Sequence, residues 1–147
     1  MTFRLRGHRS KTRASYKIAL NSRNGTAPSL AEKQFNEYQK SRGMNLIWGC
    51  TLPFYDPEKG MTYDFEMDFV HPTDQSYDLD FEVDGEAFHG TERAINKDNW
   101  KDRIKNDYSI KVIRVPAVLC QKKWWNYLDA MLPKAVLSKQ GSVRIPA

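Results

Sequence analysis

The sequence lacks several features that would each place it in a particular class of protein. Its 147 residues include only two cysteines, Cys50 and Cys120, whose isolated positions match neither a disulfide framework nor a zinc-ligand pattern. No run of apolar residues approaches the length needed to cross a membrane, and the first residues contain no apolar signal segment. These absences predict an intracellular protein, cytoplasmic or nucleoid-associated, whose two thiols are buried and reduced.

Acidic residues are absent from residues 1–28. This segment has a net charge of +7, whereas the remaining 119 residues, with 16 basic and 18 acidic side chains, sum to −2. A basic arm on a slightly acidic body favours a polyanion partner, because contacts with phosphates release counterions. A solubilising tail is the alternative, and the charge does not distinguish DNA from RNA. The residues of the arm expected to contact nucleic acid are Arg4, Arg6, Arg9, Lys11, Arg13 and Lys17.

Residues 29–147 predict a single domain, since their apolar residues suffice for one core and recur with helix and strand periods. The stretch SLAEKQFNEYQKSRG begins with the capping box Ser29 and Glu32. Its apolar residues near one face are Leu30, Phe35 and Tyr38. Further helices are expected over residues 91–109 and 121–132, and strands over residues 45–55 (interrupted near Pro53), 62–70, 77–85 and 111–115. This order predicts an α/β fold with a single mixed β-sheet flanked by helices.

Two neighbouring strands combine strict alternation with an unusual number of carboxylates. In TYDFEMDFV (62–70), the residues expected on the apolar face are Tyr63, Phe65, Met67 and Phe69. In YDLDFEVDG (77–85), the residues expected on the polar face are Asp78, Asp80, Glu82 and Asp84. A short turn between such strands predicts an antiparallel hairpin. In the expected register, Asp68 of the first strand lies close to Glu82 and Asp84 of the second.

Three carboxylates so close together repel one another unless a cation lies between them. Magnesium and manganese prefer oxygen ligands and are held by one or two carboxylates plus water. A bound ion of this kind activates water and stabilises charge on a phosphate, so the three carboxylates suit metal-assisted hydrolysis of a phosphodiester. Acidic residues on a solvated strand face are the alternative interpretation. Asp80 is expected either to support the group from behind or to face solvent.

Five short motifs in this order resemble the PD-(D/E)XK nuclease superfamily, and within it most of all the very-short-patch-repair endonucleases. They are SLAE in the first helix, MDFV, FEVDG followed by Phe88 and His89, KDRIKND in the next helix, and the strand KVIRV. The resemblance spans about residues 29–116 and implies a restriction-endonuclease-like αβββαβ core. It also implies a DNA endonuclease that depends on magnesium or manganese.

The resemblance assigns roles to particular residues. Asp68 and Glu82 match the acidic residues that bind the metal, and Glu32 matches a helix glutamate that completes the metal site through water. Asp84 stands where the motif lysine is usual. Related sequences with an E-x-D-G strand also lack that lysine, so its absence does not imply inactivity. His89 matches a histidine that relays a proton or holds the leaving oxygen.

The next helix offers a replacement for the missing cation. Lys97, Lys101 and Lys105 recur every four residues and therefore share one face of the helix. Lys101, in the middle of this lysine stripe, is the candidate for the catalytic cation. The competing interpretation, which the pattern favours, is that the stripe faces solvent and binds phosphates of the nucleic acid.

These observations leave three hypotheses about function. The first is an endonuclease that serves DNA repair, intron homing, junction resolution or phage DNA processing. The second is a nucleic-acid-binding module that has lost catalysis, which the absent motif lysine supports, and the third is an RNA-directed nuclease. The short chain leaves little room for a sequence-reading domain. This favours recognition of DNA structure, or assembly into a homodimer or higher homo-oligomer.

Overall fold

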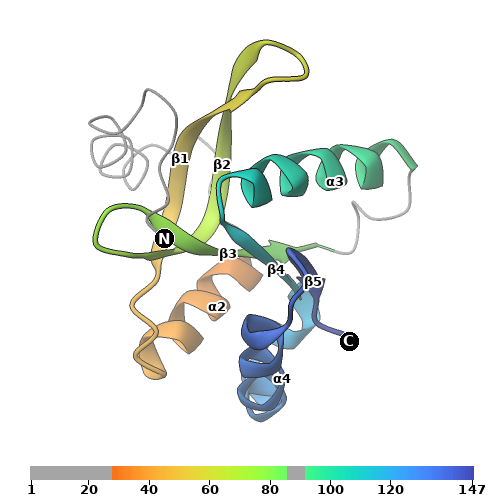
Figure 1. Cartoon of the computed structure of the whole chain (residues 1–147). Coiled ribbons are helices and arrows are strands. Elements are labelled where there is room, and N and C mark those ends of the chain that lie inside the picture. The colour runs from red at the N-terminus through yellow and green to blue at the C-terminus, as the bar shows by residue number, and fades with distance from the viewer. Residues whose placement is uncertain (1–27, 86–91) are drawn as a thin grey trace.

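The computed structural model describes residues 28–85 and 92–147, which form one five-stranded sheet with three helices (Figure 1). The basic residues of the arm and His89 lie outside the described residues. The helices are α2 (Leu30–Ser41), α3 (Glu92–Asp107) and α4 (Trp125–Leu137). The strands are β1 (Ile47–Asp56), β2 (Met61–Pro72), β3 (Tyr77–Asp84), β4 (Lys111–Pro116) and β5 (Ser142–Arg144).

The strands are ordered β1-β2-β3-β4-β5 across the sheet. Neighbours β1, β2 and β3 are antiparallel, whereas β4 runs parallel to both β3 and β5. Helix α3 makes the crossover that the parallel β3–β4 pair requires. The predicted α/β fold, a single mixed sheet flanked by helices, is therefore confirmed, and the first six elements of the described residues follow the order αβββαβ.

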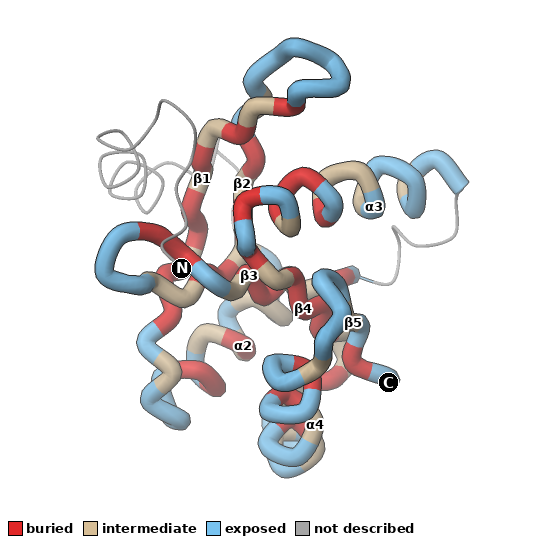
Figure 2. The backbone as a smooth tube through the Cα atoms, viewed as in Figure 1, coloured by how far each residue is buried: buried red, intermediate tan, exposed pale blue. Residues whose placement is uncertain are grey.

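Helices cover both faces of the sheet, and each face has its own hydrophobic core (Figures 1 and 2). On one face lie α2 and α4, where the Phe35 ring contacts Phe69 and Phe81 at centroid distances of 4.9 and 5.9 Å. On the other face lies α3, where Ile104 and Tyr108 pack with apolar residues of the β1–β2 hairpin. Figure 2 shows the first half of α3 largely exposed, whereas buried positions appear only in its second half.

The local sequence explains where α2 begins. The Ser29 hydroxyl accepts a hydrogen bond from the N–H of Glu32, and the Glu32 carboxylate accepts one from the N–H of Ser29, both at 3.1 Å. This confirms the predicted capping box. Phe35 and Tyr38 are buried as expected, but the expectation for Leu30 is wrong, because its side chain is 71% exposed. Five residues turn a helix by about 140° from Phe35, which carries Leu30 away from the core.

Strand β1 passes through Pro53 without the expected interruption. Pro53 pairs with Asp64 of β2 inside an unbroken register. The strand forms an edge of the sheet. Proline is tolerated on an edge because the amide hydrogen that it lacks would have pointed to solvent.

The β1–β2 hairpin changes faces at Gly49 and Asp68. Phe65 and Met67 of β2 pack beneath α3, whereas Phe69, which was expected on the same face, packs against α2. Gly49 adopts a φ of +76°, a conformation that glycine takes readily and other residues rarely do. A side-chain period of two does not continue through such a backbone, so the expectation for Phe69 is wrong.

The C-terminal part departs most from the sequence pattern. The helix predicted over residues 121–132 begins only at Trp125, after the 3-10 turns η2 (Ala117–Cys120) and η3 (Lys122–Trp124), and continues through Pro133. Pro133 removes one backbone hydrogen bond but does not end α4. Strand β5 was not predicted at all. None of the helices in the described part of the chain combines the length and the apolar character that a bilayer span requires.

Candidate functional site

Two of the predicted acids, Asp68 and Glu82, are linked by reciprocal hydrogen bonds where β2 and β3 stop pairing. The antiparallel ladder of these strands ends at Phe69 and Phe81. Beyond it, Glu82 Oε2 accepts a hydrogen bond from the backbone N–H of Asp68 at 2.9 Å. In return, Asp68 Oδ2 accepts one from the N–H of Val83 at 2.8 Å. Each carboxylate replaces a backbone carbonyl that the neighbouring strand no longer supplies. This carboxylate pair, Asp68 and Glu82, is the centre of the candidate site.

Lys105 of α3 reaches the same region through Asp80. Its Nζ donates a hydrogen bond to Asp80 Oδ2 at 2.7 Å, and the two side chains are only 2% and 0% exposed. Burial alone would lower the pKa of Lys105, but the negative charges of Asp80 and Glu82 outweigh it and raise that pKa above its usual value. Lys105 is therefore a charged ammonium inside the protein, and Asp80 lies behind the carboxylate pair, not in solvent.

Asp80 and Glu82, two residues apart on β3, lie close enough for each acid to influence the pKa of the other. Burial raises the pKa of Asp80 well above its usual value, and the charge of Glu82 adds to this effect. Burial also acts to raise the pKa of Glu82, but the charge of Lys105 and the hydrogen bonds that Glu82 accepts keep it below its usual value. Of the two acids, Asp80 is therefore the harder to ionise, and among the described residues its Oδ1 is buried without a hydrogen-bond partner, whereas Glu82 is ionised.

Asp84 is held by two arginines instead of joining the carboxylate pair. Arg114 of β4 donates to Asp84 Oδ1 at 3.0 Å, and Arg144 of β5 lies 3.0 Å from Asp84 Oδ2. In the described part of the chain, no three His, Cys, Asp or Glu side chains are grouped so as to hold a metal ion. The expected convergence of Asp84 with Asp68 and Glu82 is therefore not found.

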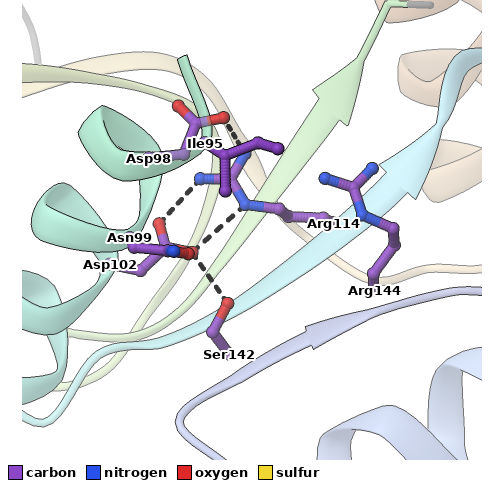
Figure 3. Close-up of a pocket in the computed structure, with 7 residues that line it drawn as sticks. All are labelled: Ile95, Asp98, Asn99, Asp102, Arg114, Ser142 and Arg144. Carbon is purple, nitrogen blue, oxygen red and sulfur yellow. Dashed lines mark hydrogen bonds and ion pairs between the residues drawn. The ribbon is translucent and has the colours of Figure 1, made fainter. Parts of the chain in front are cut away.

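Arg114 is the centre of this second charged network. It donates to both carboxylate oxygens of Asp102 at 3.1 and 2.7 Å, and it lies 3.7 Å from Asp98 (Figure 3). The Ser142 hydroxyl donates to the same Asp102 at 2.7 Å. A pocket of about 530 Å³ adjoins the network between α3 and β5, and its charged lining groups largely bind one another. It is lined by Ile95, Asp98, Asn99, Asp102, Arg114, Ser142 and Arg144.

The lysine stripe of α3 passes from solvent into the interior. Lys97 is exposed, Lys101 is partly buried with its Nζ 5.6 Å from the Phe65 ring centroid, and Lys105 is buried. Burial lowers the pKa of Lys101, and the charges of Lys97 and Lys105 lower it further, against the opposite effect of Glu82. The interpretation that the whole stripe faces solvent is therefore wrong. Lys105 in particular is not accessible to a nucleic-acid phosphate.

The remaining predicted site residues have other settings. Glu32 serves the capping box of α2 and does not form a metal-binding group of three with Asp68 and Glu82 among the described residues. His89 lies in the segment 86–91, outside the described residues, as do all the basic residues of the arm. Their roles stay predictions.

Sequence reasoning missed the buried cations that neutralise the acids of β3. A signal for them exists in the sequence. Arg114 interrupts the otherwise apolar strand KVIRV, and a buried arginine needs buried acids as partners. In KDRIKND, Asp102 and Lys105 are three residues apart and hence on one side of the helix, the side that meets those strands.

Comparisons with known proteins add no family to this description. No family model matches the chain, and the searches found neither a similar curated protein nor a similar solved structure.

Proposed function

We propose that the protein is a divalent-metal-dependent DNA endonuclease that hydrolyses phosphodiester bonds at Asp68 and Glu82. The observation that carries the proposal is that two acids of adjacent strands, at the point where strand pairing ends, each bind a backbone N–H of the other strand. The αβββαβ order of the elements and the motifs that resemble PD-(D/E)XK nucleases support it. The basic arm supports a nucleic acid as the partner.

Asp68 and Glu82 are the residues that would hold the metal. Magnesium needs only one or two carboxylates, because water and substrate phosphates complete its coordination, so a site with two acids fits. Glu82 is well suited, since its pKa is held below the usual value and the carboxylate is ionised. A bound magnesium or manganese ion would supply an activated water and would stabilise charge on the phosphate.

Lys101 is the candidate for the task of the absent motif lysine. It projects from α3 on the side of Glu82, whose charge acts on it. Burial and the two neighbouring lysines lower its pKa, which brings proton transfer closer to the working pH. Its ammonium would stabilise negative charge on the phosphate, or its amine would orient and deprotonate the attacking water. Asp84 supplies no metal ligand in this proposal, because it anchors Arg114 and Arg144.

The second candidate function is a nucleic-acid-binding module without catalysis. The observation in its favour is that the motif lysine is absent and that Asp84, which stands in its place, is committed to two arginines. A homodimer or higher homo-oligomer is compatible with either function and would enlarge the surface available to a nucleic acid.

Cleavage assays with the full chain test the proposal. The substrates are supercoiled, mismatched and branched DNA and structured RNA, each with magnesium, manganese or a chelator. We expect metal-dependent cleavage of DNA that falls roughly 100-fold or more in Asp68→Asn and in Glu82→Gln. Both replacements keep an oxygen that can accept the backbone hydrogen bond, so the fold should survive.

The matched control is Asp64→Asn, an exposed change on the same strand, which should cut like the wild type. Wild-type protein that binds DNA but cuts no substrate with either metal would overturn the proposal in favour of the binding module. Cleavage of RNA alone would instead identify an RNA-directed nuclease.

The basic arm has its own test. Deleting residues 1–28 removes seven positive charges and should weaken DNA binding and flatten its dependence on salt. Unchanged affinity and an unchanged salt slope, measured by titration at several salt concentrations, would show that the arm is only a tail.

A further inference from the structure

The lysine stripe of α3 and the carboxylate stripe of β3 have nearly the same spacing. Because β3 and β4 are parallel and α3 connects them, α3 runs back against the direction of β3. Four residues of helix advance about 6 Å, and two residues of strand advance about 6.6 Å. The two stripes therefore run in opposite directions with matching spacing, and they meet in the ion pair of Lys105 with Asp80.

The partners of the acids at the two ends of the carboxylate stripe are visible in the structure. Lys105 Nζ lies 2.7 Å from Asp80 Oδ2, and both side chains are buried. At the other end, Asp84 binds Arg114 and Arg144, so it needs no lysine, and Lys97 is exposed. In the middle, Lys101 lies over the Phe65 ring and on the side of Glu82.

We propose that Lys105 is a positioning residue: by occupying Asp80, it keeps the Lys101 ammonium away from that acid and over the Phe65 ring. Without Lys105, the buried Asp80 Oδ2 would have no donor, and Lys101, one helical turn away, is the cation that can reach it. Lys101 would then leave its position over the Phe65 ring. The catalytic meaning of this inference rests on the proposed function, whereas the pairing itself is a property of the protein without substrate.

The buried pair of Lys105 and Asp80 is not required to attach α3 to the sheet. On its other flank, Trp100 Nε1 donates to Asp56 Oδ2 at 3.1 Å, and the Tyr108 hydroxyl donates to the Tyr55 carbonyl at 3.0 Å. Ile104 is fully packed between these two residues. Burying an ammonium with a carboxyl group costs desolvation, and an apolar pair of similar volume is often equally stable or more so. The buried pair is therefore better explained by its effect on the position of Lys101 than by a contribution to the stability of the fold.

Three variants of the full chain separate positioning from stability in cleavage assays. Lys105→Met should lower kcat roughly 10- to 100-fold with little change in KM, because Lys101 turns to the vacated Asp80. The double variant Asp80→Leu with Lys105→Met removes the competing acceptor and should recover kcat to within roughly threefold of the wild type. Lys105→Arg keeps a donor for Asp80 and should also recover most of the rate.

An NMR measurement tests the same inference without any cleavage. The ε-methylene resonances of Lys101 are expected to be displaced by the ring current of Phe65, since the Nζ lies 5.6 Å from the ring centroid. In Lys105→Met they should move toward the values of a free lysine. In the double variant they should return to their wild-type positions. Asp80→Asn keeps an acceptor for Lys105 and should leave them in place, which provides a test even where Lys105→Met does not fold.

The outcomes separate this inference from the proposed function. Lys101 resonances that stay in place in folded Lys105→Met, or that move in Asp80→Asn, overturn the inference whether or not the protein cuts DNA. A double variant with wild-type Lys101 resonances but the low kcat of Lys105→Met also overturns it. A wild-type protein that cuts no nucleic acid overturns the proposed function, and the resonances alone then decide the inference.

Discussion

The two faces of β3 differ in how they are held. Phe81 and Val83 pack toward α2 and α4 in a core of aromatic and aliphatic side chains. Asp80, Glu82 and Asp84 belong to the opposite stripe, and each is bound by donors that can be named. Apolar burial is non-directional and tolerates small shifts, whereas each buried acid depends on one or two partners. The first face should therefore supply stability, and the second should supply the candidate chemistry.

The largest expected effect comes from breaking the apolar face. Phe81 is 1% exposed and contacts Phe35 across the sheet–helix interface. Phe81→Ala should lower the free energy of unfolding by about 4 kcal/mol, measured by urea denaturation, because it leaves a cavity. Phe81→Leu, the matched control, should lose about 1.5 kcal/mol or less. A loss near zero for the alanine variant would contradict the assignment of this face as the main core.

A slightly smaller loss should follow from removing the main partner on the polar face. Arg114→Met leaves Asp84 without its buried donor and Asp102 without both of its arginine hydrogen bonds. We expect a loss of about 3 kcal/mol in the free energy of unfolding. The control is Arg103→Met, whose exposed ion pair with Glu58 should contribute less than about 1 kcal/mol. Similar losses in the two variants would show that the Arg114 network behaves like a surface ion pair.

The pH dependence of the free energy of unfolding should differ between variants on the two faces of β3. In the folded protein the pKa of Glu82 lies below its usual value of 4.5. Its ionised carboxylate therefore stabilises the fold above that value, and the contribution is lost as the pH falls through the folded-state pKa. The stability advantage of the wild type over Glu82→Gln should shrink between about pH 5 and pH 3.

Val83→Ala, on the apolar face, serves as the control for this pH series. Its loss of unfolding free energy involves no ionisable group and should be constant over the same range. An advantage over Glu82→Gln that stays equally constant would show that Glu82 does not titrate as described.

The smallest effect concerns the two cysteines, which lie in different cores. Cys50 belongs to the core beneath α3 and Cys120 to the core beneath α2 and α4, and burial raises the pKa of each thiol to about 12. Neither should react with iodoacetamide at about pH 8 in the native protein, because the thiolate is the reactive form. In mild denaturant both should react at equal rates if the domain opens cooperatively. Unequal rates, read by mass spectrometry, would show that the two layers open separately.

Local patterns in the sequence predicted the elements that depend on local chemistry. The capping box of Ser29 and Glu32, the antiparallel β2–β3 hairpin, the helix that became α3 and the strand KVIRV are all confirmed. The meeting of Asp68 with Glu82 follows from the same hairpin register. The face change at Gly49 was missed, because a positive φ at a glycine leaves no mark in the alternation of its neighbours.

What the sequence pattern could not predict depends on pairs that are distant along the chain. Arg114 meets Asp84 from 30 residues away, and Lys105 meets Asp80 from 25. The side-chain periodicity of a strand or helix shows which residues share a face, but it does not show that these residues pair with each other instead of facing solvent. The three residues of β5 are too few to show a period, and they are recruited by the edge of β4. The partners of the acids, and therefore the separation of Asp84 from the carboxylate pair, required the structure.

Asp68 and Glu82 each close a gap in the backbone hydrogen bonding of the neighbouring strand. This gives the two residues a reason to persist that is independent of any reaction. A descendant of this chain that had lost cleavage would still be under selection to keep both acids, because losing either would leave an amide unpaired. Finding both acids in a related sequence would therefore indicate the same geometry of the sheet. Lys101 closes no such gap, so under the proposed function its retention or loss would be the better indicator of catalysis.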